Sequence, residues 1–85
     1  VLEKIPATLG KRITESVNIP TIGIGAGPHC SGQILVTHDM LGLFEDFRPR
    51  FVRRYAAIAE EMDRAFRLYI QDVKQRTFPN ESESY

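Results

Sequence analysis

Glu3 is the residue of this chain that is best placed to do chemistry. It follows Val1-Leu2, which look like the end of a strand, and it precedes a segment with a helical pattern. Parallel α/β enzymes often place catalytic side chains at such a point. A carboxylate partly removed from water there could take a proton from carbon. The sequence leaves an alternative equally open, in which this carboxylate stabilises the first turn of the next helix.

A second candidate is the segment 19–27, which reads Ile-Pro-Thr-Ile-Gly-Ile-Gly-Ala-Gly. Glycine at every second position bares one face of an extended segment, so a ligand or another backbone can approach it closely. The spacing G-x-G-x-G, followed by Pro28 and by no long helix, argues against a dinucleotide site. Two interpretations remain, a ligand site and glycines that only permit tight packing.

Two further groups of side chains could bind ligands. His29, Cys30, His38 and Asp39 could ligate a metal, but their spacing matches no zinc pattern, which favours structural roles. Four arginines could hold an anion, although runs of surface charge more often face solvent or contact proteins. They are Arg48, Arg50, Arg53 and Arg54.

The composition narrows the class of protein. Eleven basic side chains balance eleven acidic ones in 85 residues, so no overall field would attract nucleic acid or a membrane. The single cysteine cannot form an internal disulfide, and no apolar run approaches the roughly 20 residues of a membrane helix. We therefore expect a cytoplasmic protein that binds small molecules or other proteins. Because the chain starts with Val1 and carries no leader, we also expect an N-terminally truncated fragment.

The first half of the chain has the pattern of an α/β unit. A strand end at 1–3 is followed by a helix at 6–17, which is predicted because Ile5, Leu9, Ile13 and Val17 recur every fourth residue. Strands are predicted at 20–26 and 33–38. The connection between these strands is shorter than the dozen or so residues of a usual parallel crossover. It fits either a hairpin or a parallel pair whose crossover helix has shrunk to a turn.

Helical spacing of apolar residues predicts helices over 49–76, with Pro49 in the first turn and a break near 57–59. A break there would separate the arginines from the acidic residues Glu60 and Glu61, whose order otherwise opposes the helix dipole. The polar tail at 77–85 is expected to be loosely held.

These features together resemble the ketopantoate hydroxymethyltransferase family. The resemblance rests on Leu2-Glu3, on Ile-Gly-Ile-Gly-Ala-Gly at 22–27 and on Gly-Gln-Ile-Leu-Val at 32–36, followed by His38-Asp39. It implies an α/β fold in which residues 1–85 form the C-terminal part of a single (β/α)8 TIM barrel of the phosphoenolpyruvate mutase and isocitrate lyase type. A whole barrel typically takes ~250 residues.

The resemblance also implies an activity. The family transfers a hydroxymethyl group from 5,10-methylenetetrahydrofolate to 3-methyl-2-oxobutanoate, which gives ketopantoate for pantothenate biosynthesis. By resemblance Glu3 is the catalytic base, and Ile24, Ile34 and Val36 line the apolar part of the substrate pocket. Mg²⁺ ligands are expected upstream of this segment, so the chain alone would be inactive, and a homo-oligomer is implied. The alternatives are another carbon-carbon lyase of the same superfamily and a non-catalytic assembly segment.

Overall fold

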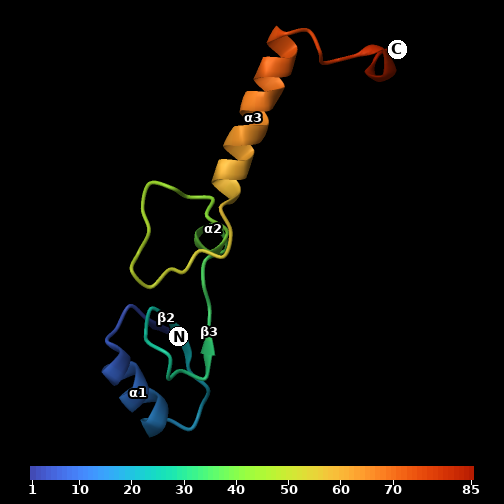
Figure 1. Cartoon of the computed structure of the whole chain (residues 1–85). Coiled ribbons are helices and arrows are strands. Elements are labelled where there is room, and N and C mark those ends of the chain that lie inside the picture. The colour runs from blue at the N-terminus through green and yellow to red at the C-terminus, as the bar shows by residue number, and fades with distance from the viewer.

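The structure, a computed structural model, describes all 85 residues. The molecule is elongated, with principal extents of 67 × 25 × 13 Å. A small sheet with one helix lies at one end, a loop region follows, and a long helix leads away to the C-terminus (Figure 1). None of the helices combines the length and the apolarity that a bilayer-spanning helix needs.

Three short strands form a parallel sheet in the order β1-β2-β3. They are β1 (Leu2–Glu3), β2 (Ile22–Ile24) and β3 (Gly32–Gln33). The parallel pairing of β2 with β3 shows that the short connection is a crossover and not a hairpin. Two reciprocal hydrogen bonds close it, from Thr21 N to Ser31 Oγ at 3.1 Å and from Ser31 N to Thr21 Oγ1 at 3.2 Å.

Helix α1 (Ala7–Ser16) lies within the predicted range 6–17 and packs against the end of β2. Its buried residue Gly10 faces Ala26, which is fully buried, so the absent side chain allows the helix and the β2 loop to approach closely. Thr14 Oγ1 lies 2.8 Å from Thr21 Oγ1, which joins the helix to the strand by a hydrogen bond. Four of the six buried residues of the chain lie at this end, and the other two, Gly42 and Val52, lie in the loop region.

The predicted strand at 33–38 is wrong beyond its first residue. Strand β3 ends at Gln33, and helix α2 (Thr37–Met40) occupies the end of the range. The amide of Ile34 still bonds to the carbonyl of Gly23, at 3.0 Å, but the amide of Met40 bonds to Val36 O at 2.9 Å in a helical turn. The side chains of this range favour a strand, but β2 has already ended and offers no backbone partner for their amides. Hydrogen bonding of the backbone therefore decides the local structure.

The predicted helix over 49–57 is also wrong, whereas helix α3 (Ile58–Lys74) begins close to the expected break. Two amides at the end of this range and at the start of α3 bond to carbonyls at the end of α2. Tyr55 N bonds to Met40 O at 2.8 Å, and Ile58 N bonds to Leu41 O at 3.0 Å. Pro49 lies in a turn closed by the bond from Val52 N to Pro49 O at 3.0 Å, and the apolar side chain of Phe51 packs on Gly25.

The tail is more ordered than its composition suggests. A short 3-10 helix, η1 (Glu81–Glu83), is capped by Asn80, whose side chain accepts a hydrogen bond from Glu83 N at 3.2 Å. In return Asn80 N donates to the Glu83 carboxylate at 2.9 Å. The reciprocal pair is a capping box, which satisfies two amides that would otherwise face only water.

Candidate functional site

The carboxyl ends of the three strands meet at one edge of the sheet, because all three run in the same direction. Glu3 is the register partner of Ile24, and the Gly23–Gln33 pair places Ile34 next in the same row. Residues at one level of a sheet point to the same face. Three of the four predicted site residues, Glu3, Ile24 and Ile34, therefore form one row across the sheet.

Backbone bonds continue past the strand ends and fix the loops that begin there. Lys4 N donates to Ile24 O at 2.9 Å, and Ile5 N donates to Gly25 O at 3.1 Å. The side chain of Gln33 donates to Gly27 O at 2.9 Å. The glutamine of the Gly-Gln-Ile-Leu-Val motif thus holds the loop at residues 25–27 that follows β2, here called the glycine loop.

Phe51 is a site residue that the sequence analysis missed. A Cβ on Gly25 would lie 2.9 Å from two atoms of the Phe51 ring, and Gly25 has a φ of +69°. The ring therefore sits directly on bare backbone, in a conformation that suits glycine. The alternating glycines were a signal that something approaches the strand end, and here a side chain from a distant loop does so.

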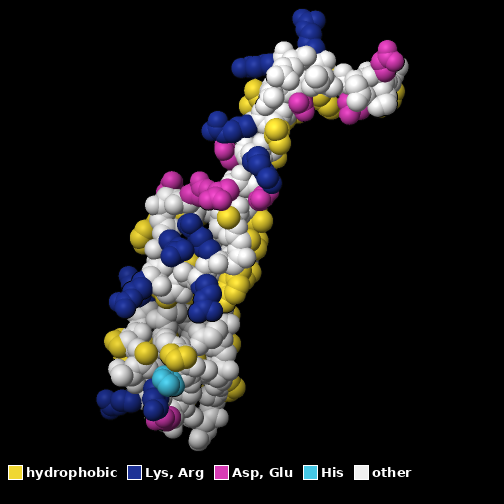
Figure 2. Space-filling view, in the orientation of Figure 1, with side chains coloured by type: hydrophobic (Ala, Val, Ile, Leu, Met, Phe, Trp, Pro, Cys, Tyr) yellow, Lys and Arg dark blue, Asp and Glu magenta, His cyan; other side chains and the backbone are white.

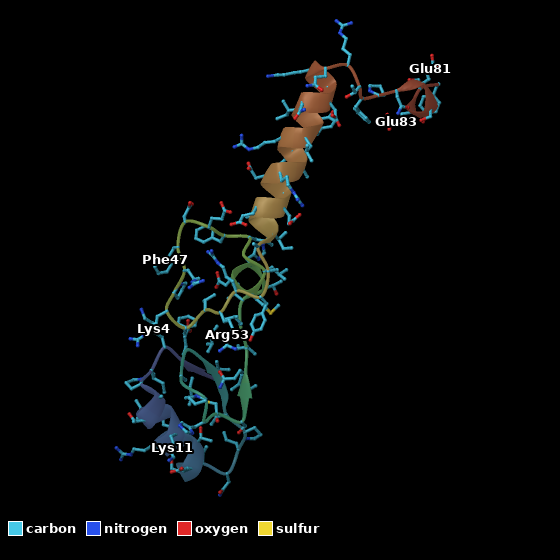
Figure 3. All side chains as sticks on the ribbon, in the orientation of Figure 1. Lys4, Lys11, Phe47, Arg53, Glu81 and Glu83 are labelled. Carbon is cyan, nitrogen blue, oxygen red and sulfur yellow. The ribbon has the colours of Figure 1, made fainter.

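Two clefts open beside this contact, and both are lined by Gly25 and Phe51. The larger, of about 770 Å³, is lined also by Glu3, Lys4, Ile5, Ala7, Phe47, Pro49 and Arg50. The smaller, of about 510 Å³, is lined also by Gln33, Ile34, Leu35, Met40, Arg53 and Tyr55. Figure 3 shows Lys4, Phe47 and Arg53 on the segments that meet where the sheet joins the loop region.

The predicted site residues divide between these clefts. Glu3 lines the larger and Ile34 the smaller, whereas Ile24 and Val36 line neither. Ile34 and Val36 are apolar but about half exposed, at 51% and 50%. These side chains form an open apolar face on the chain and not a closed pocket.

The surroundings of Glu3 bear on the two interpretations of this residue. Helix α1 begins at Ala7, has no acidic residue in its first turn and has no side-chain cap bond. The three ion pairs of the chain use other carboxylates, those of Glu15, Glu61 and Asp63. Glu3 is exposed, lines the larger cleft and makes no capping hydrogen bond to α1.

The possible metal ligands do not converge. No three histidine, cysteine, aspartate or glutamate side chains of the chain come together in a group that could hold a metal ion. Residues of this segment therefore do not fit a magnesium site by themselves, since Mg²⁺ favours several oxygen ligands in octahedral geometry.

A comparison with known protein families shows to which family the chain belongs. Residues 1–81 match the profile of the ketopantoate hydroxymethyltransferase family. The chain belongs to this family. The resemblance noted in the sequence is thus confirmed at the level of the family.

Curated relatives in this family match the whole chain. A 3-methyl-2-oxobutanoate hydroxymethyltransferase from Chlorobaculum tepidum is 56% identical over all 85 residues, which cover 31% of that protein. Enzymes of the same name from Porphyromonas gingivalis and Salinibacter ruber are each 59% identical over the full chain, which covers 31% and 32% of them. The chain therefore spans about a third of the length of the relatives it matches.

Proposed function

We propose that these residues form part of a 3-methyl-2-oxobutanoate hydroxymethyltransferase, with Glu3 as its catalytic base. The observation that carries the proposal is an identity of 56% to enzymes of that name along the entire chain. The reaction would move a hydroxymethyl group from 5,10-methylenetetrahydrofolate to the oxo-acid and so form ketopantoate. The same match disfavours the alternative of another carbon-carbon lyase.

The parallel sheet supports a finer proposal about architecture. Three parallel strands with their carboxyl ends at one edge are what a segment of a (β/α)8 barrel would contribute. One row of the sheet bears Glu3, Ile24 and Ile34, and Ile34 is half exposed within this chain. We infer that residues 1–85 are the C-terminal part of a single barrel domain, whose other strands would enclose this face.

In that setting the Glu3 carboxylate would remove the proton from C3 of 3-methyl-2-oxobutanoate. The enolate that remains carries a nucleophilic carbon, which would bond to the one-carbon unit of the folate. The bonds from that one-carbon unit to the folate nitrogens would break, water would supply the hydroxyl oxygen, and tetrahydrofolate would leave. Ile24, Ile34 and Val36 would contact the branched methyl groups and exclude water. Magnesium, if bound, would need ligands from residues outside this segment, and it would polarise the oxo group.

A catalytic role for Glu3 can be tested in a chimera. The matching third of the Chlorobaculum tepidum enzyme is replaced by these 85 residues, which keeps the rest of that protein intact. Glu3→Gln in this chimera should slow deuterium exchange at C3 of the oxo-acid by about 10²- to 10⁴-fold, the usual contribution of a general base. Glu60→Gln, at an exposed position of α3, is the matched control and should leave the exchange unchanged.

The outcomes separate the possible functions of the segment. A folded chimera that forms no ketopantoate would contradict the proposed activity. An active chimera in which Glu3→Gln exchanges deuterium at the original rate would refute only the base assignment. The second result would instead favour an assembly role, which is suggested by the exposed apolar residues of α3, namely Met62, Phe66, Leu68, Tyr69, Ile70 and Val73. A homo-oligomer would be one way to cover them.

A further inference from the structure

Five cationic side chains of the sheet end and the loop region make no ion pair, and three of them line the clefts. They are Lys4, Arg48, Arg50, Arg53 and Arg54, and the three ion pairs of the chain all involve other cations. Figure 2 shows dark blue side chains grouped over the middle of the molecule, between the sheet end and α3. The net charge of the chain is zero, so this is a local concentration of positive charge.

The members of this group have different roles. The Arg54 guanidinium donates to Phe44 O at 2.7 Å, which ties the two ends of the loop together. Lys4 and Arg50 line the larger cleft, and Arg53 lines the smaller one. Three cations thus border two adjoining clefts that share Gly25 and Phe51, and they make no ion pair of their own.

Aromatic surface accompanies these charges. Phe47 and Phe51 both line the larger cleft, and Phe47 is 66% exposed. A flat conjugated ring can stack on such side chains while its charged end reaches the cations. The volumes of about 770 and 510 Å³ fall in the range of small-molecule sites.

We propose that Lys4, Arg50 and Arg53 bind the glutamate carboxylates of the folate cosubstrate, an inference that rests on the function proposed above. The oxo-acid has one carboxylate, whereas a folate combines flat rings with a tail of several carboxylates. Cations spread over two adjoining clefts match the extended tail better than the small acid. Because Glu3 lines the cleft that holds Lys4 and Arg50, a folate bound there lies beside the proposed base.

The test compares folates in the active chimera. Arg50→Gln combined with Arg53→Gln should raise the KM for methylenetetrahydrofolate with a polyglutamate tail by about tenfold or more, as expected for the loss of charge-assisted bonds. The monoglutamate form should be affected less. The kcat and the folate-independent deuterium exchange of the oxo-acid should stay unchanged. The matched control is the pair Arg12→Gln and Arg76→Gln, which removes the same charge from positions outside both clefts.

A second measurement needs no substitution. In the unsubstituted chimera, KM should fall as the glutamate tail lengthens, and this advantage should shrink as salt is added. Equal KM values for short and long tails would overturn the inference, as would an unchanged KM in the double variant. A double variant that loses its oligomeric state at an unchanged KM would show that these arginines contact another subunit instead. Loss of C3 exchange in the unsubstituted chimera would contradict the proposed function and not this site.

Discussion

The sheet end of the molecule and helix α3 obtain their order from different interactions. At the sheet end, segments distant in sequence meet through buried groups such as Thr21 and Ala26. Helix α3 has no buried residue and projects from the rest of the chain (Figure 1). Its visible support is local, including the bond from Arg67 Nε to the Asp63 carboxylate at 2.8 Å. That bond and the charge of Asp63 raise the pKa of Arg67.

This difference indicates where the chain will tolerate change. A close contact between two segments leaves no room for an added atom, whereas an exposed helix face can lose a large side chain without leaving a cavity. The candidate site lies on the first kind of structure. We therefore expect substitutions in the glycine loop to have large effects on stability and those on α3 to have small ones.

The largest effect is expected for Gly27→Ala. Gly27 has a φ of +82°, and a Cβ there would lie 2.5 Å from Ala7 Cβ and 2.8 Å from Ala7 Cα. Backbone strain and overpacking together should lower the free energy of unfolding by about 2–4 kcal/mol. Urea unfolding of the 85-residue chain would show a much lower midpoint or no cooperative transition.

Gly32→Ala is the control for this experiment, because a Cβ at Gly32 would have no neighbour within 4 Å and its φ is not positive. It should change the free energy of unfolding by no more than about 0.5 kcal/mol. Equal losses from the two substitutions would show that contact with α1 does not restrict Gly27.

The same contrast explains how much of the fold the sequence could predict. Helix α1 was predictable because its apolar residues recur with the helical period over a segment whose own backbone closes the bonds. The range 49–57 has a similar period, yet Tyr55 and Ile58 give their amides to Met40 and Leu41. The period of the apolar residues shows which side chains can share a buried face. It does not show to which carbonyl a given backbone amide donates its hydrogen bond.

The site shows the same division between local and distant contacts. Glu3 was predictable as a candidate because it lies between a strand end and a helix. The alternating glycines predicted that another group approaches the backbone near Gly25. Nothing local identified Phe51 as the group that approaches, because the two residues are brought together only by the loop that follows α2. The catalytic role of Glu3 and the pocket roles of Ile24, Ile34 and Val36 stay predictions.

An intermediate effect is expected for Thr21→Val. The hydroxyl oxygen of Thr21 accepts from Ser31 N at 3.2 Å and lies 2.8 Å from Thr14 Oγ1, so valine removes both bonds while keeping the shape. The free energy of unfolding should fall by about 1–2 kcal/mol, since partly buried groups lose their partners. Thr8→Val, at an exposed position of α1, is the same chemical change and should be nearly neutral. A neutral Thr21→Val would mean that water replaces these bonds without cost.

The smallest effect is expected for Phe66→Ala in α3. Phe66 is 59% exposed, so truncation leaves no cavity. Lost contacts along the helix face, about 0.2–0.5 kcal/mol, should be offset by the better helix propensity of alanine, about 0.5 kcal/mol. Circular dichroism and urea unfolding of the 85-residue chain should therefore change little.

Phe51→Ala is the matched substitution at the sheet end, where the ring lies on Gly25. It should cost at least about 1 kcal/mol, because it opens a gap above bare backbone. If Phe66→Ala costs as much as Phe51→Ala, then α3 is covered by another surface in solution and the contrast between the two regions fails. If only Phe51→Ala is costly, the loop is held on the glycine strand by this ring, and the clefts that share it depend on the same contact.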